Sequence, residues 1–486
     1  MTSGRRLIIA FVPLAVAVIG AVAAWHYAAL DLTLSHYDAR GHLIVARRVV
    51  DSLTPGWRQL GAMWLPLPHV LNLVPAQWMW NYQTGLSAVL INIAAMAIGL
   101  GAMARLVARH TGSVWAALCA VAVVLLNPNV LYLQSTAMTE PLLFGLCWLA
   151  LDAIDRTLDL PEFSPTLPAA GPWLALATLT RYEAWPVAAA LVTIAALSRV
   201  GMVRVRLFVR LAAWPALTAA AFLLFGRLTL GKWMADAEFF TPDNPAAHQP
   251  LLVLEQIGRG FLALTGPAFS LIAVIGVAVA AWRAWQTRSV RPLLPIALAA
   301  AAALPFFAFL NGHPFRIRYM VPLIAASGAL IGVAVGAVPR RARPAAALLV
   351  AALALWTRPP YQSDAPMVLE AQRERPAQLG RAPITATLAS SYDGTPILAS
   401  MGSLGHYMQE TSHIGLNLRD YLCEGNGDLW SAAIRAPRRH VGWILIEGSA
   451  EGGDYLSGLA REDPRFLEGF TEVASGGGAR LYKKIN

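Results

Sequence analysis

Apolar runs of about 17 to 25 residues, the length that a helix needs to cross a membrane, recur along this chain. The chain is 57% hydrophobic and only 14% charged over 486 residues, so these runs are not the buried faces of soluble amphipathic helices. A segment in lipid must satisfy its backbone hydrogen bonds internally, which favours helices. The sequence therefore predicts an all-α polytopic membrane protein.

The apolar runs predict about eleven transmembrane helices. They cover residues 6–30, 84–104, 113–131, 139–154, 171–180, 185–198, 211–226, 259–282, 292–310, 319–338 and 344–356. Positive residues concentrate in cytoplasmic loops, and here they fill alternate loops. These are Arg5/Arg6, Arg105/Arg109, Arg156, Arg199/Arg204/Arg206/Arg210, Arg283/Arg288/Arg291 and Arg340/Arg341/Arg343. The N-terminus is thus predicted to be cytoplasmic and the tail to lie outside, in a bacterial inner membrane with a periplasmic tail.

The first run has a second interpretation. Residues 1–24 carry two arginines, an apolar stretch and "AVAA", which is the pattern of a cleaved signal peptide. The apolar run continues without a break to Leu30, which favours a transmembrane helix.

The net charge of +10 does not indicate nucleic-acid binding. Of the 38 Lys and Arg residues 13 lie in 358–486, with 15 of the 28 Asp and Glu, which leaves 25 against 13 in the membrane part. That excess fits loop charges that set orientation. Three scattered cysteines give no disulfide framework, and no Walker A loop, HExxH or internal repeat is present.

The last part of the chain reads as a small α/β domain. "TPILAS", "HVGWILIEG" and "ARLYKK" have the pattern of short strands, and "RDYLCEGNGDLWSAAIRA" reads as helical. "MGSLGHYMQ" follows the first strand, where Gly402 and Gly405 favour a turn and His406 could face the membrane site. Two domains are expected: 1–357, with surface helices at about 38–75, and 358–486 outside the membrane.

Unusual polar residues collect on the predicted outer side. They are His36, Asp38, Arg40, His42, Glu140, Arg181, Glu183, Lys232, Asp236, Glu238, His313, Arg316 and Arg318. Acids and bases at membrane depth are costly, so their gathering on one side predicts a functional site.

The stretch "HYDARGHLIVARRVVDSL" after the first run has helical spacing. Leu43, Ala46, Val50 and Leu53 recur on one face, and Arg40, Arg47 and Asp51 fall on another. This pattern predicts a helix lying on the membrane surface. Asp38 stands near its start, where a carboxylate could instead cap free backbone amides.

These features together resemble a known family. An Asp just after the first span with two surface helices, a "TEP" start to the fourth span and an "RYMVP" entry to a late span are similar to the GT-C superfamily of integral membrane glycosyltransferases. The protein O-mannosyltransferases and the lipid A aminoarabinose transferases are the members that it resembles most. No WWDYG stretch occurs, unlike in oligosaccharyltransferases.

The resemblance implies transfer of a sugar, with inversion, from a polyprenyl-phosphate donor to a hydroxyl of a glycan, lipid or protein acceptor outside the membrane. It implies Asp38 as the general base, with Glu140 as a second catalytic acid. Guanidinium groups suit the phosphate of the leaving lipid, and here the candidates are Arg181, Arg316 and Arg318, with Lys232 behind them. Acceptor or supporting roles are assigned to His36, His42, Glu183, His313 and His406.

Plainer roles stay open for several candidates. Glu140 could cap its helix through the helix dipole, and Arg181 and Glu183 could pair with each other. Arg316 and Arg318 could anchor in the headgroup layer. No cofactor is certain, although the two acids could hold a divalent cation, Mg or Mn.

Three rival functions are considered. A polymer ligase acting on lipid-linked glycan is chemically close to a monosaccharide transferase. A transporter would need charged or broken helices near mid-membrane and related halves, and neither is visible in the sequence. A non-catalytic assembly protein would not need acids and arginines that converge.

Overall fold

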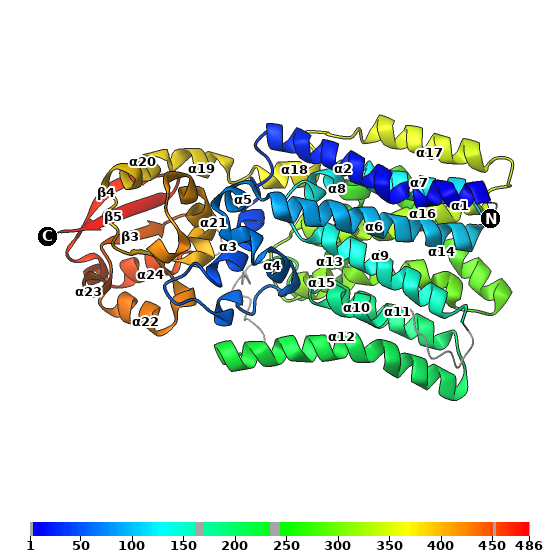
Figure 1. Cartoon of the computed structure of the whole chain (residues 1–486), viewed down its shortest axis with the longest axis horizontal. Helices are drawn as coiled ribbons and strands as arrows, with labels where there is room; N and C mark the ends of the chain where they lie inside the picture. The colour runs from blue at the N-terminus through cyan, green and yellow to red at the C-terminus, as the bar shows by residue number, and fades with distance from the viewer. Residues whose placement is uncertain (1–2, 161–169, 234–243, 451–452, 486) are drawn as a thin grey trace. The chain divides into compact units, whose positions relative to one another are not determined.

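The computed structural model describes residues 3–160, 170–233, 244–450 and 453–485, so Asp236 and Glu238 lie outside the described residues. The chain forms two compact units that interleave along the sequence (Figure 1). Unit 1 comprises residues 1–30, 89–225 and 239–369, and unit 2 comprises 31–88, 226–238 and 370–486. The expected domains, 1–357 and 358–486, follow the sequence and stay a prediction.

Unit 1 is helical. Its elements are α1 (Ser3–Ala10), α2 (Val12–Ala29), α6 (Leu86–Thr111), α7 (Val114–Leu125), α8 (Pro128–Gln134), α9 (Glu140–Thr157), α10 (Ala170–Thr178), α11 (Ala184–Leu197), α12 (Gly201–Leu230), α13 (Pro250–Thr265), α14 (Pro267–Thr287), η3 (Arg291–Ala302), α15 (Ala303–Leu310), η4 (Ile317–Met320), α16 (Pro322–Ala337), α17 (Arg343–Thr357) and α18 (Pro366–Ala371). Each predicted apolar run falls on one or more of these helices.

Within the described part of the chain, six helices are long and apolar enough to cross a membrane. They are Leu7–Ala29, Leu86–Thr111, Gly201–Leu230, Pro267–Thr287, Arg291–Leu310 and Ile317–Ala337. A seventh span would join α7 and α8, which are bent by 69° at their break. The chain is therefore an integral membrane protein, as the sequence predicts.

Two predicted spans differ from the observed helices. The single run 259–282 is divided between α13 and α14, because Gly266 has a φ of +91° that favours glycine and ends α13. The run 211–226 belongs to a helix that begins ten residues earlier, since α12 includes Arg204, Arg206 and Arg210.

A close helix crossing places α9 in unit 1. A Cβ added to Gly99 of α6 would lie 2.5 Å from Gly145 Cα of α9, and one added to Gly145 would lie 2.4 Å from the carbonyl oxygen of Ala95. Only glycine allows the two backbones to approach so closely. This crossing positions the helix that begins with Glu140.

The arginine-rich loops of unit 1 meet one another. Asp155 Oδ2 lies 2.8 Å from Arg109 Nε, and its Oδ1 lies 2.7 Å from Arg291 Nε. Arg283 donates to the carbonyl of His110 at 2.9 Å. The remaining links are Arg343 to the Thr111 carbonyl and Arg199 to the Leu158 carbonyl. Five loops that were predicted to share one side of the membrane are thus tied together at one end of unit 1.

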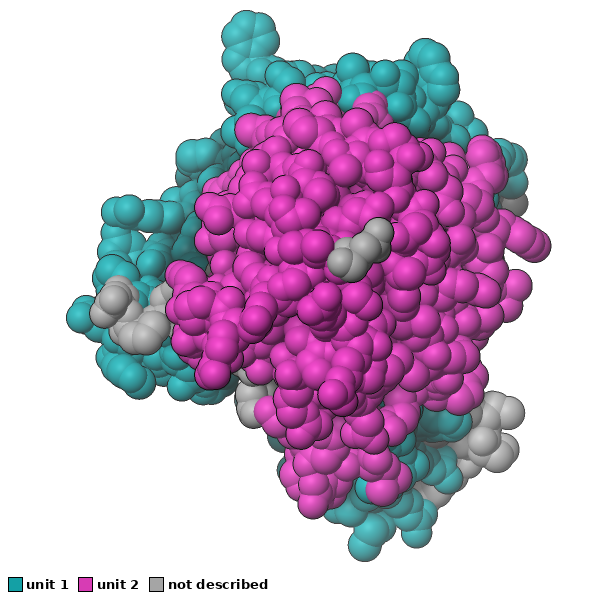
Figure 2. Space-filling model, turned by 90° about the vertical axis from the view of Figure 1, so that its left-hand side faces the viewer, with its two compact units in different colours: residues 1–30, 89–225, 239–369 teal, residues 31–88, 226–238, 370–486 magenta. Residues whose placement is uncertain are grey.

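Unit 2 combines the first loop with the tail. Its elements are α3 (Tyr37–Arg48), η1 (Trp57–Leu60), α4 (Leu67–Asn72), η2 (Pro75–Gln77), α5 (Met79–Thr84), α19 (Arg375–Gly380), α20 (Ala382–Ser391), β1 (Ile397–Ala399), α21 (Met401–Glu410), η5 (Thr411–Ile414), η6 (Leu418–Asp420), β2 (Tyr421–Leu422), η7 (Glu424–Asn426), α22 (Asp428–Arg435), α23 (Pro437–His440), β3 (Trp443–Glu447), α24 (Tyr455–Glu462), η8 (Pro464–Leu467), β4 (Phe470–Gly476) and β5 (Ala479–Lys484). Figure 2 shows their side chains as one continuous body. Within it, α3 packs against α21.

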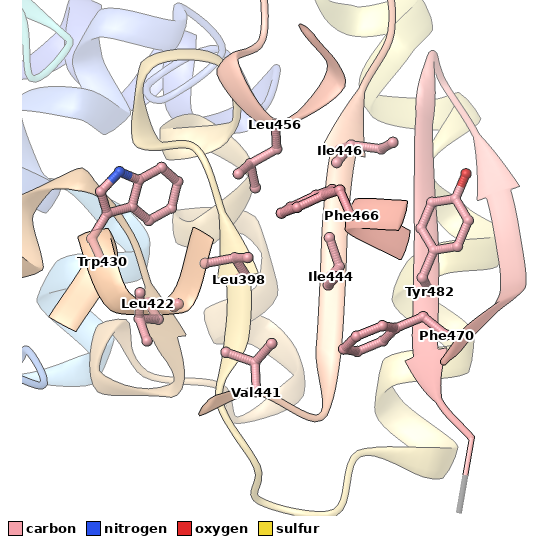
Figure 3. Close-up of a cluster of buried hydrophobic side chains, with 11 residues drawn as sticks. Leu398, Leu422, Trp430, Val441, Ile444, Ile446, Leu456, Phe466, Phe470 and Tyr482 are labelled. Atoms are coloured by element: carbon pink, nitrogen blue, oxygen red, sulfur yellow. The ribbon is translucent and has the colours of Figure 1, made fainter. Parts of the chain in front are cut away.

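The tail contains a five-stranded mixed sheet in the order β2-β1-β3-β5-β4. β1 is parallel to β2 and β3, whereas β5 is antiparallel to β3 and β4. Leu398, Ile444 and Ile446 of the central strands form a buried apolar cluster with Phe466 and Phe470 (Figure 3). This cluster is the core of the predicted α/β domain, and the predicted strands around 397, 443 and 479 are confirmed.

Two tail predictions are wrong. "MGSLGHYMQ" is not a glycine turn but helix α21, in which Gly402 and Gly405 have ordinary helical backbone. The stretch 419–436 is helical only in part, because Tyr421–Leu422 form β2 and the α-helix α22 begins at Asp428. In both places contacts within the sheet domain override local propensity.

The predicted surface helix exists, but its polar face is covered. Arg40, Arg47 and Asp51 are buried, whereas Val50 is 53% exposed. Arg47 donates to Asn417 Oδ1 at 3.1 Å, and Asp51 binds the backbone amide of Leu418. The polar face that the sequence predicts thus binds the tail.

Candidate active site

Asp38 lies in the first turn of α3 and is only 5% exposed. The residue that caps this helix is His36, whose extended backbone precedes the helix and whose Nδ1 accepts the amide of Asp38 at 3.1 Å. His36 therefore supplies the side-chain cap, and a structural role of the Asp38 carboxylate at the free amides of the first turn stays an alternative prediction. Its carboxylate is held at a helix N-terminus, where the dipole favours negative charge.

The other histidine of α3 faces a second buried histidine. His42 Nδ1 lies 3.0 Å from His69 Nε2, and its ring packs on Trp64 with centroids 4.3 Å apart. Burial lowers the pKa of His69 to about 3, with a further contribution from Arg48. His69 is therefore neutral at neutral pH, and the pair belongs to the packing between α3 and α4.

His406 lies on α21, the tail helix that packs against α3. Burial lowers the pKa of His406 to about 3, and the positive charges of Arg381 and Arg40 lower it further. The ring is therefore neutral at neutral pH. As a neutral imidazole it can take part in hydrogen bonding but does not offer a charge to a phosphate.

Glu140, Arg181 and Glu183 meet in unit 1. Arg181 Nη1 lies 3.0 Å from Glu140 Oε1, and its Nη2 lies 2.6 Å from Glu183 Oε1. The same guanidinium donates to Thr139 Oγ1 at 3.0 Å. Both acids are buried, so Arg181 compensates two charges that would be costly alone. The pairing of Arg181 with Glu183 that the sequence left open is present.

A second basic group in unit 1 precedes α16. Arg316 is the residue before η4 and is buried, and Arg318 lies within η4 with its guanidinium 5.7 Å from the ring of Tyr319. The hydroxyl of Tyr319 lies 3.2 Å from His313 Nε2, and Tyr319 is also an electrostatic neighbour of Arg181. Tyr319 thus binds His313 within the loop before α16 and lies within electrostatic range of Arg181.

The structure assigns the candidates to two groups. Unit 1 holds Glu140, Arg181, Glu183, His313, Arg316 and Arg318, and unit 2 holds His36, Asp38, His42, Lys232 and His406. Lys232 follows α12 and is exposed. Among the described residues, no group of three or more His, Cys, Asp or Glu side chains could hold a metal ion.

Some partners were missed from the sequence. Glu370 lies 3.5 Å from His36 Nε2, and Glu410 forms an ion pair with Arg40. Both acids are more than 300 residues from their partners and stand in no recognisable motif. Their only signal is that "PMVLEA" and "HYMQET" each carry one acid beside apolar residues.

Each group has a chemistry of its own. Unit 2 offers a carboxylate, Asp38, on a helix that is fixed at its first turn, which suits a general base. Unit 1 offers guanidinium groups at the ends of apolar helices, where the anionic head of a lipid phosphate would lie. Arg181 has two carboxylate partners, and Arg181, Arg316 and Arg318 all stay candidates for a phosphate.

Comparison with solved structures identifies the fold. The chain is similar to ArnT from Cupriavidus metallidurans bound to undecaprenyl phosphate, with a TM-score of 0.55, 16% identity and coverage of 99% of this chain and 98% of that one. It is also similar to the apo form of the same protein, with a TM-score of 0.58, 15% identity and coverage of 99% of this chain and 98% of that one. An oligosaccharyltransferase from Archaeoglobus fulgidus matches over 93% of this chain and 72% of that one, at 13% identity and a TM-score of 0.49.

No protein-family model and no curated protein sequence matches the chain. The likeness to ArnT extends over both units and nearly the whole of each chain. ArnT is a GT-C glycosyltransferase, the lipid A aminoarabinose transferase. In its fold the chain is thus similar to ArnT, as the resemblance predicted from the sequence implies: apolar helices with a small α/β domain in the tail.

Proposed function

We propose that this protein transfers a sugar from a polyprenyl-phosphate donor to a hydroxyl of an acceptor at the outer face of the membrane. The observation that carries the proposal is the full-length likeness to a structure of ArnT bound to undecaprenyl phosphate. The residue types present support it as well, since unit 2 carries the buried carboxylate of Asp38 and unit 1 carries arginines at helix ends. A transfer of this kind needs a carboxylate for the acceptor and cations for the phosphate.

Asp38 acts as the general base in this reaction. It accepts the proton of the acceptor hydroxyl as the oxygen attacks the anomeric carbon of the sugar. The bond between that carbon and the phosphate oxygen breaks, and its electron pair leaves with the polyprenyl phosphate. One displacement at the anomeric carbon inverts its configuration. The burial of Asp38 at a helix N-terminus supports a fixed position for its carboxylate.

Arg316 and Arg318 bind the donor phosphate. They stand where the loop after α15 enters α16, a helix that is apolar and almost wholly buried. Their guanidinium groups stabilise the charge that develops on the leaving phosphate. Glu140 and Glu183 hold Arg181 in place.

The test is transfer by the purified full-length protein in lipid nanodiscs. Undecaprenyl phosphate carrying a radiolabelled pentose or hexose is supplied with a membrane glycolipid extract as acceptor, and labelled product is measured. We expect Asp38→Asn to reduce turnover by about 10²- to 10⁴-fold, the usual loss for a general base. Turnover close to wild type in Asp38→Asn would contradict the role of this residue.

A matched control separates chemistry from folding. Asp463 in the tail forms an ion pair with Arg465 in which both side chains are largely exposed. We expect Asp463→Asn to keep wild-type turnover, with a melting temperature equal to that of Asp38→Asn. The absence of transfer by the wild type with every donor sugar tested would overturn the proposed reaction itself.

A further inference from the structure

The segment of Asp38 is held from both sides by acids of the tail. Two residues before Asp38, His36 Nε2 lies 3.5 Å from Glu370 Oε1. Two residues after it, the guanidinium of Arg40 forms an ion pair with Glu410. His36 and Arg40 are both buried, so neither pair is a solvated surface contact. Glu370 and Glu410 lie more than 300 residues further along the chain.

The hydrogen bond from the amide of Asp38 fixes the tautomer of His36. Its Nδ1 accepts the amide hydrogen of Asp38 at 3.1 Å, and a nitrogen that accepts a hydrogen bond carries no proton. The proton of the neutral ring is therefore on Nε2, which faces Glu370. A carboxylate beyond a histidine fixes its tautomer and its ring orientation, as it does for histidines that bind metals. The amide of Asp38 is thus tied through one imidazole to the tail.

The contact with Glu410 is shared with a second arginine. Arg381 Nη2 lies 2.9 Å from Glu410 Oε1, and the guanidinium of Arg381 lies over the ring of Tyr407 at 5.1 Å. Arg381 is fully buried, and its Nε and Nη1 make no hydrogen bond. Glu410 is consequently the carboxylate that Arg40 and Arg381 share. His406 nearby is neutral, so it carries no charge that could compensate theirs.

Arg40 is held in one orientation by three acceptors. Besides Glu410, its Nε donates to the carbonyl of Leu34 at 2.5 Å and its Nη2 donates to Gln378 Oε1 at 3.2 Å. The planar guanidinium makes these contacts in fixed directions. Because α3 packs against α21, a change at Glu410 moves Arg40 and with it the first turn of α3.

We propose that Glu370 and Glu410 are positioning residues, which set the place of the Asp38 carboxylate through His36 and Arg40; this inference rests on the proposed role of Asp38. Neither acid touches the reacting atoms. The tail domain is then part of the catalytic apparatus, because its acids hold the residues that stand two positions before and two positions after the base. A displacement of about 1 Å at a reacting group can cost on the order of 10²-fold in rate.

The first test compares two tail carboxylates in the full-length protein in nanodiscs. Glu410→Gln is the test variant. Asp393→Asn is the control, because Asp393 binds Thr395 and Trp443 in the tail and makes no contact with α3. We expect Glu410→Gln to lower kcat by about 10- to 100-fold with the KM for the lipid donor unchanged. Asp393→Asn should keep the wild-type kcat. A wild-type kcat in Glu410→Gln would overturn the inference.

The second test does not depend on activity. Hydrogen exchange followed by mass spectrometry reports the amides of residues 37–41, of which that of Asp38 is bound to His36. We expect faster exchange there in Glu410→Gln and in Glu370→Ala, with the amides of β3 unchanged, and no effect in Asp393→Asn. Unchanged protection of 37–41 in both test variants would overturn the positioning role even if the wild type were active.

The two tests also separate this inference from the proposed reaction. If the wild type transfers no sugar but Glu410→Gln exposes residues 37–41, the proposed function fails while the link from the tail to Asp38 stands. If Glu410→Gln fails to fold, Glu410→Asp keeps the charge and shortens the reach. It should give a smaller loss of kcat in the same direction, and a KM effect alone would contradict the inference.

Discussion

Asp51 Oδ1 accepts a hydrogen bond from Arg419 Nε at 2.7 Å, although the two residues are 368 positions apart. Arg47 Nε lies 2.7 Å from the other oxygen of the same carboxylate, and the amides of Leu418 and Arg419 also donate to it. Asp51 is buried, so this carboxylate joins the end of the first loop to the tail inside unit 2.

We expect Asp51→Asn to destabilise unit 2. Asparagine has no negative charge to offer Arg47, and its NH2 group would face a donor. Removing one partner of a buried ion pair costs about 3 to 5 kcal/mol. The pair of Asp51 with Arg419 contributes less to this loss than the pair with Arg47, because the Arg419 side chain is exposed. Thermal unfolding in detergent measures the effect. Asp463→Asn, at an exposed pair, should stay within about 0.5 kcal/mol of wild type, and an equal loss in both variants would contradict the prediction.

The same carboxylate predicts loss of stability in acid. Burial opposes ionisation of Asp51, but hydrogen bonds from Arg419 and Arg47 outweigh it and hold its pKa below the ordinary value. Because the pKa of Asp51 is lower in the folded protein than in the unfolded chain, ionised Asp51 stabilises the fold. This contribution is fully present above the unfolded pKa of about 3.9. This stability is lost as the pH falls through the folded value. We expect the wild type to lose stability below about pH 4, and Asp51→Asn to lose less over the same range.

Glu447 should have the opposite pH dependence. Burial raises its pKa to about 7, and the negative charges of Glu374, Asp454 and Glu410 add to this while Arg381 opposes it. The folded protein then holds a proton that the unfolded chain releases near pH 4.3, so stability falls as the pH rises from about 4 to 7. The loss is on the order of 3 to 4 kcal/mol.

Glu447→Gln tests this directly, because glutamine is neutral throughout. We expect the variant to be more stable than the wild type at pH 8 and equal to it at pH 4.5. Unfolding can be followed by differential scanning calorimetry of the purified protein at each pH. Equal slopes of stability against pH in the two proteins would show that Glu447 titrates normally.

The sequence predicts the elements better than it predicts their partners. The apolar runs mark the helices of unit 1 because a membrane requires long apolar segments, and the strands around 397, 443 and 479 carry enough buried apolar residues to be recognised. Strand β4, "FTEVASG", was missed because its residues beyond Phe470 are exposed or only partly buried. A strand with little buried surface has little hydrophobic pattern.

In the candidate site, too, the sequence predicts individual residues better than their partners. The sequence singles out Asp38 and the arginines because charge is rare near membrane helices. It cannot find Glu370 or Glu410, since nothing local marks an acid whose partner comes from the first loop. It also places Arg40, Arg47 and Asp51 on one face of a helix, but helical spacing does not show that the tail covers that face and buries them.

The arginines of unit 1 should differ in what their replacement does. Arg181 compensates two buried acids, so Arg181→Ala should destabilise the protein by about 3 to 5 kcal/mol. Arg316→Lys and Arg318→Lys keep the charge but lose bidentate binding of a phosphate. We expect these two to raise the KM for the lipid donor with little change in melting temperature. A wild-type KM in both would return them to the role of headgroup anchors.

The last prediction concerns orientation. Arginines from three loops pair with Asp152 and Asp155 at one end of unit 1, where Arg199 and Arg343 from two further loops bind backbone carbonyls. Positive loops of membrane proteins stay in the cytoplasm. This end of unit 1 should therefore be cytoplasmic, with the N-terminus on the same side and residue 486 outside. A phosphatase that is active only outside, fused after residue 486, should be active, and a fluorescent reporter that folds only in the cytoplasm should be dark there. The same reporters placed after residue 288, in the loop between α14 and η3, should give the reverse pattern. A bright cytoplasmic reporter after residue 486 would place the tail, and with it Asp38 of the same unit, on the side opposite to the one that the proposed reaction requires.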